Sequence, residues 1–159
     1  MLKSVCHKES ITLPDELAIN IARESSRNLR RSILMLEACH VQKRDGLTAD
    51  QPVQKTDWEL YIAQLAGEIA KEQSPMKLAA AREKLYELLV NCIPADVILK
   101  TLVKELTRNL DNSLKPEVYH WAAFYEHRIA MGSKEIFHLE AFIAKYMAIY
   151  KKYLNELFA

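Results

Sequence analysis

Residues 94–110, PADVILKTLVKELTRNL, decide the fold class, because they follow the pattern of an amphipathic helix. Proline is well placed at a helix start, since the first amides of a helix have no intrahelical partner to lose. Large apolar residues then recur at every fourth position, at Ile98, Leu102, Leu106 and Leu110. This spacing predicts a helix that directs one face into a core.

Helix patterns continue on both sides of this stretch, and the alternation typical of strands is missing. The motif Thr56-Asp57-Trp58-Glu59 is a capping box, in which the Thr hydroxyl and the Glu carboxylate bind free amides at a helix start. Further helices are expected from Ser74-Pro75, after the polar turn 111–113 up to Gly132, and through the apolar residues of 139–154. Their short links predict a five-helix bundle.

The N-terminal third also has helical patterns. Thr12-Leu13-Pro14-Asp15-Glu16 is a helix start, and a break near Ser25-Ser26 precedes a second helix over about 27–43. Residues 44–55 show no periodicity and contain Gly46 and Pro52, so we interpret them as a connector and domain boundary. The prediction is an all-α chain with domains at 1–45 and 56–159.

Composition narrows the possible functions. The formal charge of +1 disfavours binding to nucleic acid by bulk electrostatics. No apolar run is long enough to span a membrane. Cys6, Cys39 and Cys92 are odd in number and widely spaced, which indicates free thiols in a reducing compartment. We therefore expect a cytosolic or nuclear protein.

Arginines gather at the start of the second helix, at Arg27, Arg30 and Arg31. We expect all three in its first turn and on one side of it. Cations there oppose the helix dipole, which suggests an anionic partner, and guanidinium groups suit phosphate oxygens. The alternative is a solvated face paired to carboxylates such as that of Glu24, and charge runs are more often of this kind.

The same helix carries two apolar strips. The expected inner strip consists of Leu29, Ile33, Leu36 and His40. A second strip consists of Leu34, Ala38 and Val41. A helix that is apolar on two sides normally packs on two sides. The second partner could be the five-helix bundle or a domain outside this chain, and the pattern does not separate the two.

No catalytic or metal-binding motif emerges. The pairs Cys6-His7 and Cys39-His40 lack the spacing of zinc ligands, so we expect no metal and interpret His40 as a core histidine with a satisfied ring. There is no Gly-rich phosphate loop, no HExxH motif and no nucleophile elbow.

Aromatic residues concentrate in the last two helices. Their intervals of three and four residues favour core packing over base stacking. Tyrosine is also favoured at protein interfaces. We therefore expect part of the cluster to face another subunit, with Tyr125, Phe142, Tyr146 and Tyr150 as candidates.

Three stretches carry a family resemblance. Residues 11–38, ITLPDELAINIARESSRNLRRSILMLEA, resemble the helical lid of an AAA+ ATPase of the clamp-loader type. Residues 125–152, YEHRIAMGSKEIFHLEAFIAKYMAIYKK, resemble the closing helices of the replication factor C collar, most of all those of the subunit 3 type, and TDWELY at 56–61 is similar to the start of that collar. The resemblance implies a partial three-helix lid followed by a five-helix collar.

The resemblance also implies functional assignments. Arg30 matches the lid arginine, called sensor 2, that reaches the terminal phosphate of the nucleotide, so the intact subunit would bind ATP or ADP. Family members often carry a small residue and an Asp where this chain has Arg27 and Asn28. The nucleotide-binding domain would lie outside this chain, so we expect no cofactor and no catalysis here.

The implied partners are the other replication factor C subunits. Through the whole complex they also include the sliding clamp, proliferating cell nuclear antigen, and primer–template DNA in the nucleus. The expected function is assembly of the pentameric clamp loader for DNA replication. The alternative is a freestanding helix-turn-helix-like DNA-binding module, with the arginines on phosphates.

Overall fold

The computed structural model describes residues 1–43 and 46–158. Within these residues it contains eight helices and no strand, which confirms the all-α prediction. The chain divides into two compact units, Met1–Thr56 and Asp57–Ala159. The domain limits expected from the sequence were 1–45 and 56–159, so the structural division falls at the C-terminal end of the expected connector.

The first unit is built from three helices, α1 (Leu2–Lys8), α2 (Asp15–Glu24) and α3 (Leu29–Gln42). Helix α3 packs against both α1 and α2. The small core contains mainly apolar residues from all three helices and from the segment after α3, namely Cys6, Leu17, Ile21, Met35, Leu36, Cys39 and Leu47. Pro14 is the N-cap of α2, one position before the first helical residue.

The segment after α3 is more than a connector. Leu47 belongs to the core of the first unit, and the side chain of Gln51 is buried. The amide Nε2 of Gln51 donates a hydrogen bond of 2.7 Å to the carbonyl oxygen of Cys39, near the end of α3. The described part of this segment therefore belongs to the first unit, which corrects its interpretation as a connector; Arg44 and Asp45 lie outside the described residues.

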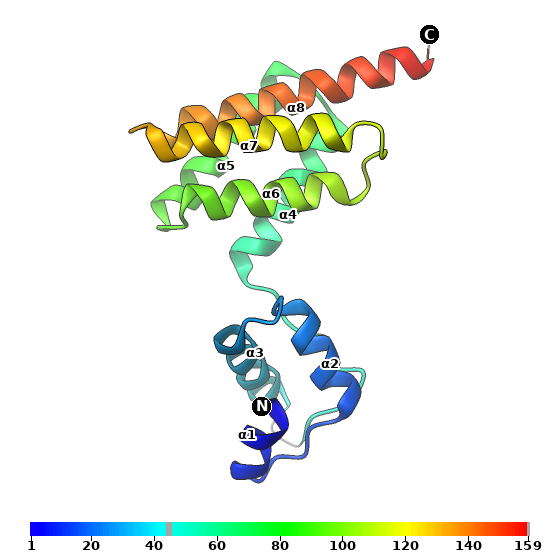
Figure 1. The fold of residues 1–159 in the computed structure, drawn as a ribbon, viewed down its shortest axis with the longest axis vertical. Helices are drawn as coiled ribbons and strands as arrows, with labels where there is room; N and C mark the ends of the chain where they lie inside the picture. Colours follow the sequence, from blue (N-terminus) through cyan, green and yellow to red (C-terminus); the bar gives the residue numbers. More distant parts are fainter. Residues whose placement is uncertain (44–45, 159) are drawn as a thin grey trace. The chain divides into compact units, whose positions relative to one another are not determined.

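The second unit contains five helices, α4 (Asp57–Lys71), α5 (Pro75–Val90), α6 (Ala95–Arg108), α7 (Lys115–Met131) and α8 (Glu135–Phe158). They contact one another in a closed cycle, α4 to α6, α6 to α7, α7 to α8, α8 to α5 and α5 back to α4. Figure 1 shows α7 and α8 side by side, with α6 next to α7. The predicted five-helix bundle is confirmed.

The stretch that predicts the fold class is central to this unit. Ile98, Leu102, Leu106 and Leu110 are all buried in its core, as expected. Helix α6 covers 95–108, with Pro94 as its N-cap. Leu110 lies just beyond the helix and still packs inward, so the stripe extends past the last helical turn.

Gly132 ends α7 for a reason of space. Its φ of −96° is open to any residue. A Cβ atom at this position would lie 2.7 Å from Nε2 of His138 and 3.0 Å from the carbonyl oxygen of Arg128. A larger residue would thus crowd the last turn of α7 and the ring of His138, and the predicted stop at Gly132 is confirmed.

Candidate functional site

The turn between α2 and α3 positions the arginines. Ser26 and Arg27 both have left-handed backbone conformations, with φ of 52° and 63°. Asn28 then caps α3, because its side-chain oxygen accepts a hydrogen bond of 3.1 Å from the amide of Arg31. Arg30 is thus the second residue of α3 and is exposed, whereas Arg27 precedes the cap. This corrects the expectation that all three arginines lie in the first turn.

Two buried serines hold this turn in place. The hydroxyl of Ser32 donates a hydrogen bond of 2.7 Å to the hydroxyl of Ser25, and it also lies 2.8 Å from the carbonyl oxygen of Asn28. The hydroxyl of Ser25 in turn lies 3.1 Å from the carbonyl oxygen of Ala22. These contacts join the end of α2 to the first turns of α3 and so position the backbone that carries Arg30.

The local charge favours an anion near Arg30. The first turn of α3 contains no acidic residue, although acidic residues stabilise that end of a helix. The first turn contains the cationic residues Arg30 and Arg31 in place of acidic ones. An exposed guanidinium beside capped helical amides can bind a phosphate oxygen. The nucleotide role of Arg30 stays a prediction.

The inner strip expected on α3 was wrong in part. The buried residues are Ser32, Met35, Leu36 and Cys39, whereas Leu29 is exposed. Nδ1 of His40 is buried and has no hydrogen-bond partner within residues 1–43 and 46–158, so the ring is not the satisfied one expected. A hydrophobicity pattern gives weight to Leu and little to Ser. In the structure, the hydrogen bond between Ser32 and Ser25 and the packing of Cys39 in the core place these two α3 residues, Ser32 and Cys39, on the buried side of the helix.

The second strip of α3 is open in part. Leu34 and Val41 expose 56% and 58% of their surface, and Ala38 is half-buried. Leu34, Ala38 and Val41 give the first unit a partly exposed apolar helix face, whereas the exposed Leu29 lies on a different side of α3. Such a face is typical of a surface that another domain covers.

In the second unit, the four aromatic candidates for a subunit interface separate into two groups. Phe142 and Tyr146 are 1% and 2% exposed and fill the core of the bundle, so their side chains are not available to another subunit. Tyr125 and Tyr150 are half-buried and pack against that core. The interface role therefore stays a prediction for Tyr125 and Tyr150 only.

The half-buried tyrosines are held by aromatic contacts. The ring of Tyr150 stacks on that of Tyr146 with a centroid distance of 5.9 Å, and Tyr125 meets Phe142 edge-on at 6.4 Å. Phe124, exposed on α7, packs edge-on against Tyr125 at 5.2 Å. The sequence interpretation missed exposed aromatic residues at Tyr86, Tyr119, Phe124 and Phe137 as surface candidates, because periodicity alone does not show which side of an aromatic helix stays open.

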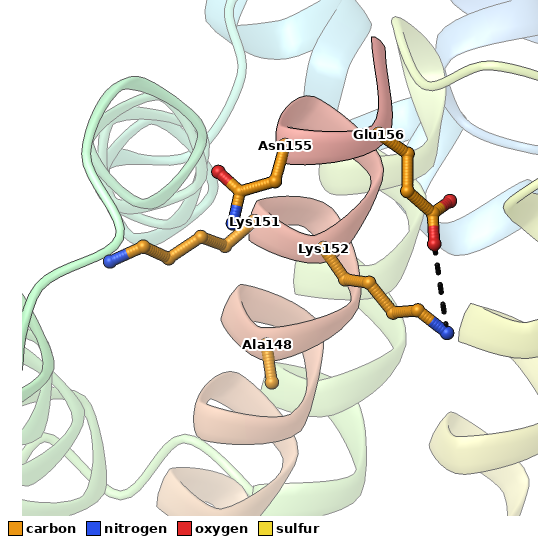
Figure 2. A pocket seen from close by; sticks show the side chains of 5 residues that line it. All are labelled: Ala148, Lys151, Lys152, Asn155 and Glu156. Atoms are coloured by element: carbon orange, nitrogen blue, oxygen red, sulfur yellow. Dashed lines mark ion pairs between the residues drawn. The ribbon is translucent and has the colours of Figure 1, made fainter. Parts of the chain in front are cut away.

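A shallow hollow on α8 is part of a solvated helix face. Figure 2 shows that its five lining residues, Ala148, Lys151, Lys152, Asn155 and Glu156, all come from this one helix. The ammonium of Lys152 lies 3.8 Å from a carboxylate oxygen of Glu156, four residues later. This is a solvated helix face, and pairs of this kind contribute little.

Other sites are not evident in the described residues. Over residues 1–43 and 46–158, no helix combines the length and apolar character of a membrane span. Nor does this part of the chain gather three or more His, Cys, Asp or Glu side chains in a way that could hold a metal ion. Cys6, Cys39 and Cys92 are free thiols, as expected; burial raises the pKa of Cys6 and Cys39.

Comparison with known proteins distinguishes between the two functions that the sequence analysis left open. The family described as "Replication factor C subunit 3, C-terminal domain" matches residues 58–154, and the "RCF1/5-like, AAA+ ATPase lid domain" matches residues 1–41. The chain belongs to the replication factor C family. The predicted resemblance to the lid and collar of replication factor C is confirmed, and no finding supports the alternative of a freestanding DNA-binding module.

Individual replication factor C subunits agree with this assignment. Replication factor C subunit 3 of Arabidopsis thaliana is 54% identical over 99% of the chain. The human subunit 3 is 50% identical over 98%, and subunit 5 of rice, Oryza sativa, is 52% identical over 99%. In each case the chain spans 44% of the relative's length.

Proposed function

We propose that this chain serves the assembly of replication factor C, through contacts between its five-helix unit and other subunits of the complex. The observation that carries the proposal is the match of residues 58–154 to the family's C-terminal domain, together with the compact packing of the same residues. The chain would have no catalytic activity alone. The sequence supports this, since it contains neither a Gly-rich phosphate loop nor a nucleophile elbow.

The assembly role can be tested by mixing. The whole chain, combined with separately purified full-length replication factor C subunits, is expected to co-elute with at least one of them in size-exclusion chromatography. An amphipathic bundle that buries surface against a partner should give a complex at micromolar concentration. Strictly separate elution from every subunit would refute the proposed function.

For the intact subunit, we propose a part in ATP-driven placement of the sliding clamp, proliferating cell nuclear antigen, on primer–template DNA in the nucleus. Arg30 would bind the terminal phosphate of ATP or ADP there. What supports this is its exposed position in the first turn of a capped helix whose first turn has no carboxylate.

The role of Arg30 has its own test. In the full-length subunit, Arg30→Ala is expected to weaken nucleotide binding about tenfold or more, because a hydrogen-bonded charge contributes about 1.5–3 kcal/mol. Arg23→Ala, an exposed arginine at the end of α2, is the matched control and should bind normally. Co-elution with partner subunits should survive both changes. Equal nucleotide affinity in Arg30→Ala would refute the assignment.

A direct DNA-binding role makes a different prediction. If the arginines of the α2–α3 turn bound about three phosphates, DNA affinity of the isolated chain would fall with salt at a log–log slope of about −3. We expect negligible affinity instead, given the net charge of +1.

A further inference from the structure

The start of α5 contains a four-residue motif, Ser-Pro-Met-Lys at 74–77, where the turn after α4 enters the helix. Of the five prolines in the chain, Pro75 alone follows a residue with a side-chain hydroxyl; the others follow Leu13, Gln51, Ile93 and Lys115. The sequence therefore has a single Ser/Thr-Pro dipeptide. A basic residue, Lys77, stands at the third position after its serine.

A helix start explains the serine and the proline of this motif but not the lysine. Ser74 is the N-cap of α5, and its Oγ accepts a hydrogen bond of 3.3 Å from the amide of Lys77. Proline at the first helical position is favourable as well. Lys77 occupies the third helical position, where capping favours Glu or Gln and a cation opposes the helix dipole. The lysine thus indicates a second use of the motif.

Serine followed by proline is the substrate pattern of proline-directed protein kinases. Proline has no backbone N–H, so it suits a cleft that offers no hydrogen-bond partner after the acceptor serine, where any other residue would bury an unpaired amide. Several of these kinases, including the cyclin-dependent ones, also favour a basic residue three positions after the serine, because it pairs with an anionic group of the kinase. Residues 74–77 meet both requirements.

The motif is accessible in the folded chain. Pro75 is exposed, and Met76 exposes 84% of its surface. Ser74 is half-buried and has an extended backbone, with φ of −128° and ψ of 156°, which is the conformation of a substrate peptide in a kinase cleft. Its hydroxyl donates a hydrogen bond of 2.7 Å to a carboxylate oxygen of Glu72, an exposed residue whose side chain is free to turn away.

The first turn of α5 can open without disturbing the core. A kinase needs residues 75–77 extended, and these residues form that turn. Ser74 is joined to the helix by two hydrogen bonds, from the amide of Leu78 to its carbonyl oxygen at 3.0 Å and from the amide of Lys77 to its hydroxyl at 3.3 Å. The first buried residue of α5 is Ala81. Fraying of the first turn therefore removes no fully buried side chain from the core.

We propose that Ser74 is a phosphorylation site for a proline-directed protein kinase that favours a basic residue three positions later. In the reaction, Oγ of Ser74 attacks the terminal phosphorus of ATP held by the kinase. The new Oγ–P bond forms as the bond from that phosphorus to the bridging oxygen breaks, ADP leaves, and the hydroxyl proton passes to a carboxylate of the kinase. The modification depends neither on the assembly role of the second unit nor on Arg30.

Phosphorylation would preserve α5 and change the turn before it. The first turn of α5 contains no acidic residue, so a phosphate at the N-cap meets no like charge within the helix start and is favoured by the helix dipole. Glu72 is repelled by the phosphate and loses its hydrogen bond to the hydroxyl. The α4–α5 turn thus gains a charge of roughly −1.5 to −2 while the helix remains.

The test incubates the whole chain with ATP and a purified cyclin-dependent kinase bound to its cyclin. Trypsin cuts after Lys71 and Lys77 and releases residues 72–77, in which Ser74 is the only residue with a hydroxyl, so mass spectrometry of this peptide assigns the phosphate. One phosphate on this peptide is expected. Ser133→Ala, at an exposed serine that no proline follows, is the control and should be phosphorylated like the unchanged chain.

Variants within the motif separate the hydroxyl from the proline and the lysine, with initial rates measured by incorporation of radiolabelled phosphate. Ser74→Asn removes the acceptor and keeps a good N-cap, so the fold is retained and the label at this site is lost. Pro75→Ala keeps the hydroxyl and should lower the rate about tenfold or more. Lys77→Ala should lower it about threefold or more, whereas Lys71→Ala, exposed at the end of α4, should leave it unchanged.

Three results would overturn the proposal. If the folded chain takes up no phosphate, the first turn of α5 does not open to the kinase. If Ser74→Asn is labelled as fully as the unchanged chain, another residue is the acceptor. If Pro75→Ala is labelled as fast as the unchanged chain, the kinase does not recognise the motif. Circular dichroism on each variant shows that the fold is retained, so a lost label is not a consequence of unfolding.

Discussion

The hydroxyl of Ser32 in α3 lies 2.7 Å from the hydroxyl of Ser25 at the end of α2, and both side chains are buried. The two residues are seven positions apart, and the turn between them contains the two left-handed residues Ser26 and Arg27. A buried hydroxyl pair of this kind fixes the entry of the chain into α3. It therefore determines where Arg30 stands, two residues after the helix cap.

The first prediction concerns this pair. Ser32→Ala should reduce the free energy of unfolding of the first unit by about 1–2 kcal/mol, because the hydroxyl of Ser25 loses a buried partner. The change can be measured by urea denaturation. Ser4→Ala, exposed on α1, is the control and should lie within about 0.5 kcal/mol of the unchanged chain. If Ser32→Ala lowers the free energy of unfolding no more than Ser4→Ala does, the hydroxyl pair does not stabilise the first unit.

The second prediction concerns Arg27. Its φ of 63° is unfavourable for a residue with a Cβ atom and open to glycine. Arg27→Gly should therefore leave stability unchanged or raise it by up to about 1 kcal/mol. Arg23→Gly, in the last turn of α2, should lower it by up to about 1 kcal/mol. The opposite directions of the two changes, measured in the same urea titrations, are the test; a comparable loss in both would contradict the left-handed conformation.

The third prediction distinguishes core from surface aromatics. Phe142→Ala should destabilise the second unit by about 3–5 kcal/mol, because the ring is fully buried and its removal leaves a cavity. Phe137→Ala, exposed on the same helix, should cost less than about 0.5 kcal/mol. Thermal unfolding followed by circular dichroism measures both. Similar losses would mean that α8 packs on a different face.

The fourth prediction concerns alkaline pH. Burial raises the pKa of Tyr146 from 10.0 to about 12. Below pH 10 the phenol is neutral in both folded and unfolded chains, so it adds no pH dependence. Between about pH 10 and pH 12 the unfolded chain releases the proton first, so the free energy of unfolding falls as pH rises.

Tyr146→Phe is the matched variant for this effect. It lacks the ionising group and should lose less stability between pH 9 and pH 11.5 than the unchanged chain, in urea titrations at each pH. Tyr61, whose pKa is also raised to about 12, contributes to the remaining slope in both proteins. Identical pH profiles would show that the phenol of Tyr146 is not protected in the folded chain.

The fold class, the helix starts and the family could be predicted from the sequence. These features are local: a proline or a capping side chain acts within one helical turn, and the apolar repeat of residues 94–110 reflects the helix period. Phosphate-loop and zinc-ligand motifs are likewise short sequence patterns. Local chemistry of this kind can be recognised without coordinates.

Tertiary structure alone decided which face of each helix is covered. The buried face of α3 includes Ser32 because its hydroxyl meets Ser25, and the buried amide of Gln51 binds a helix carbonyl twelve residues away. The separation of Phe142 and Tyr146 from Tyr125 and Tyr150 likewise depends on neighbouring helices. Burial is a property of the partners that surround a residue, and the periodicity of one helix carries no information on where those partners lie.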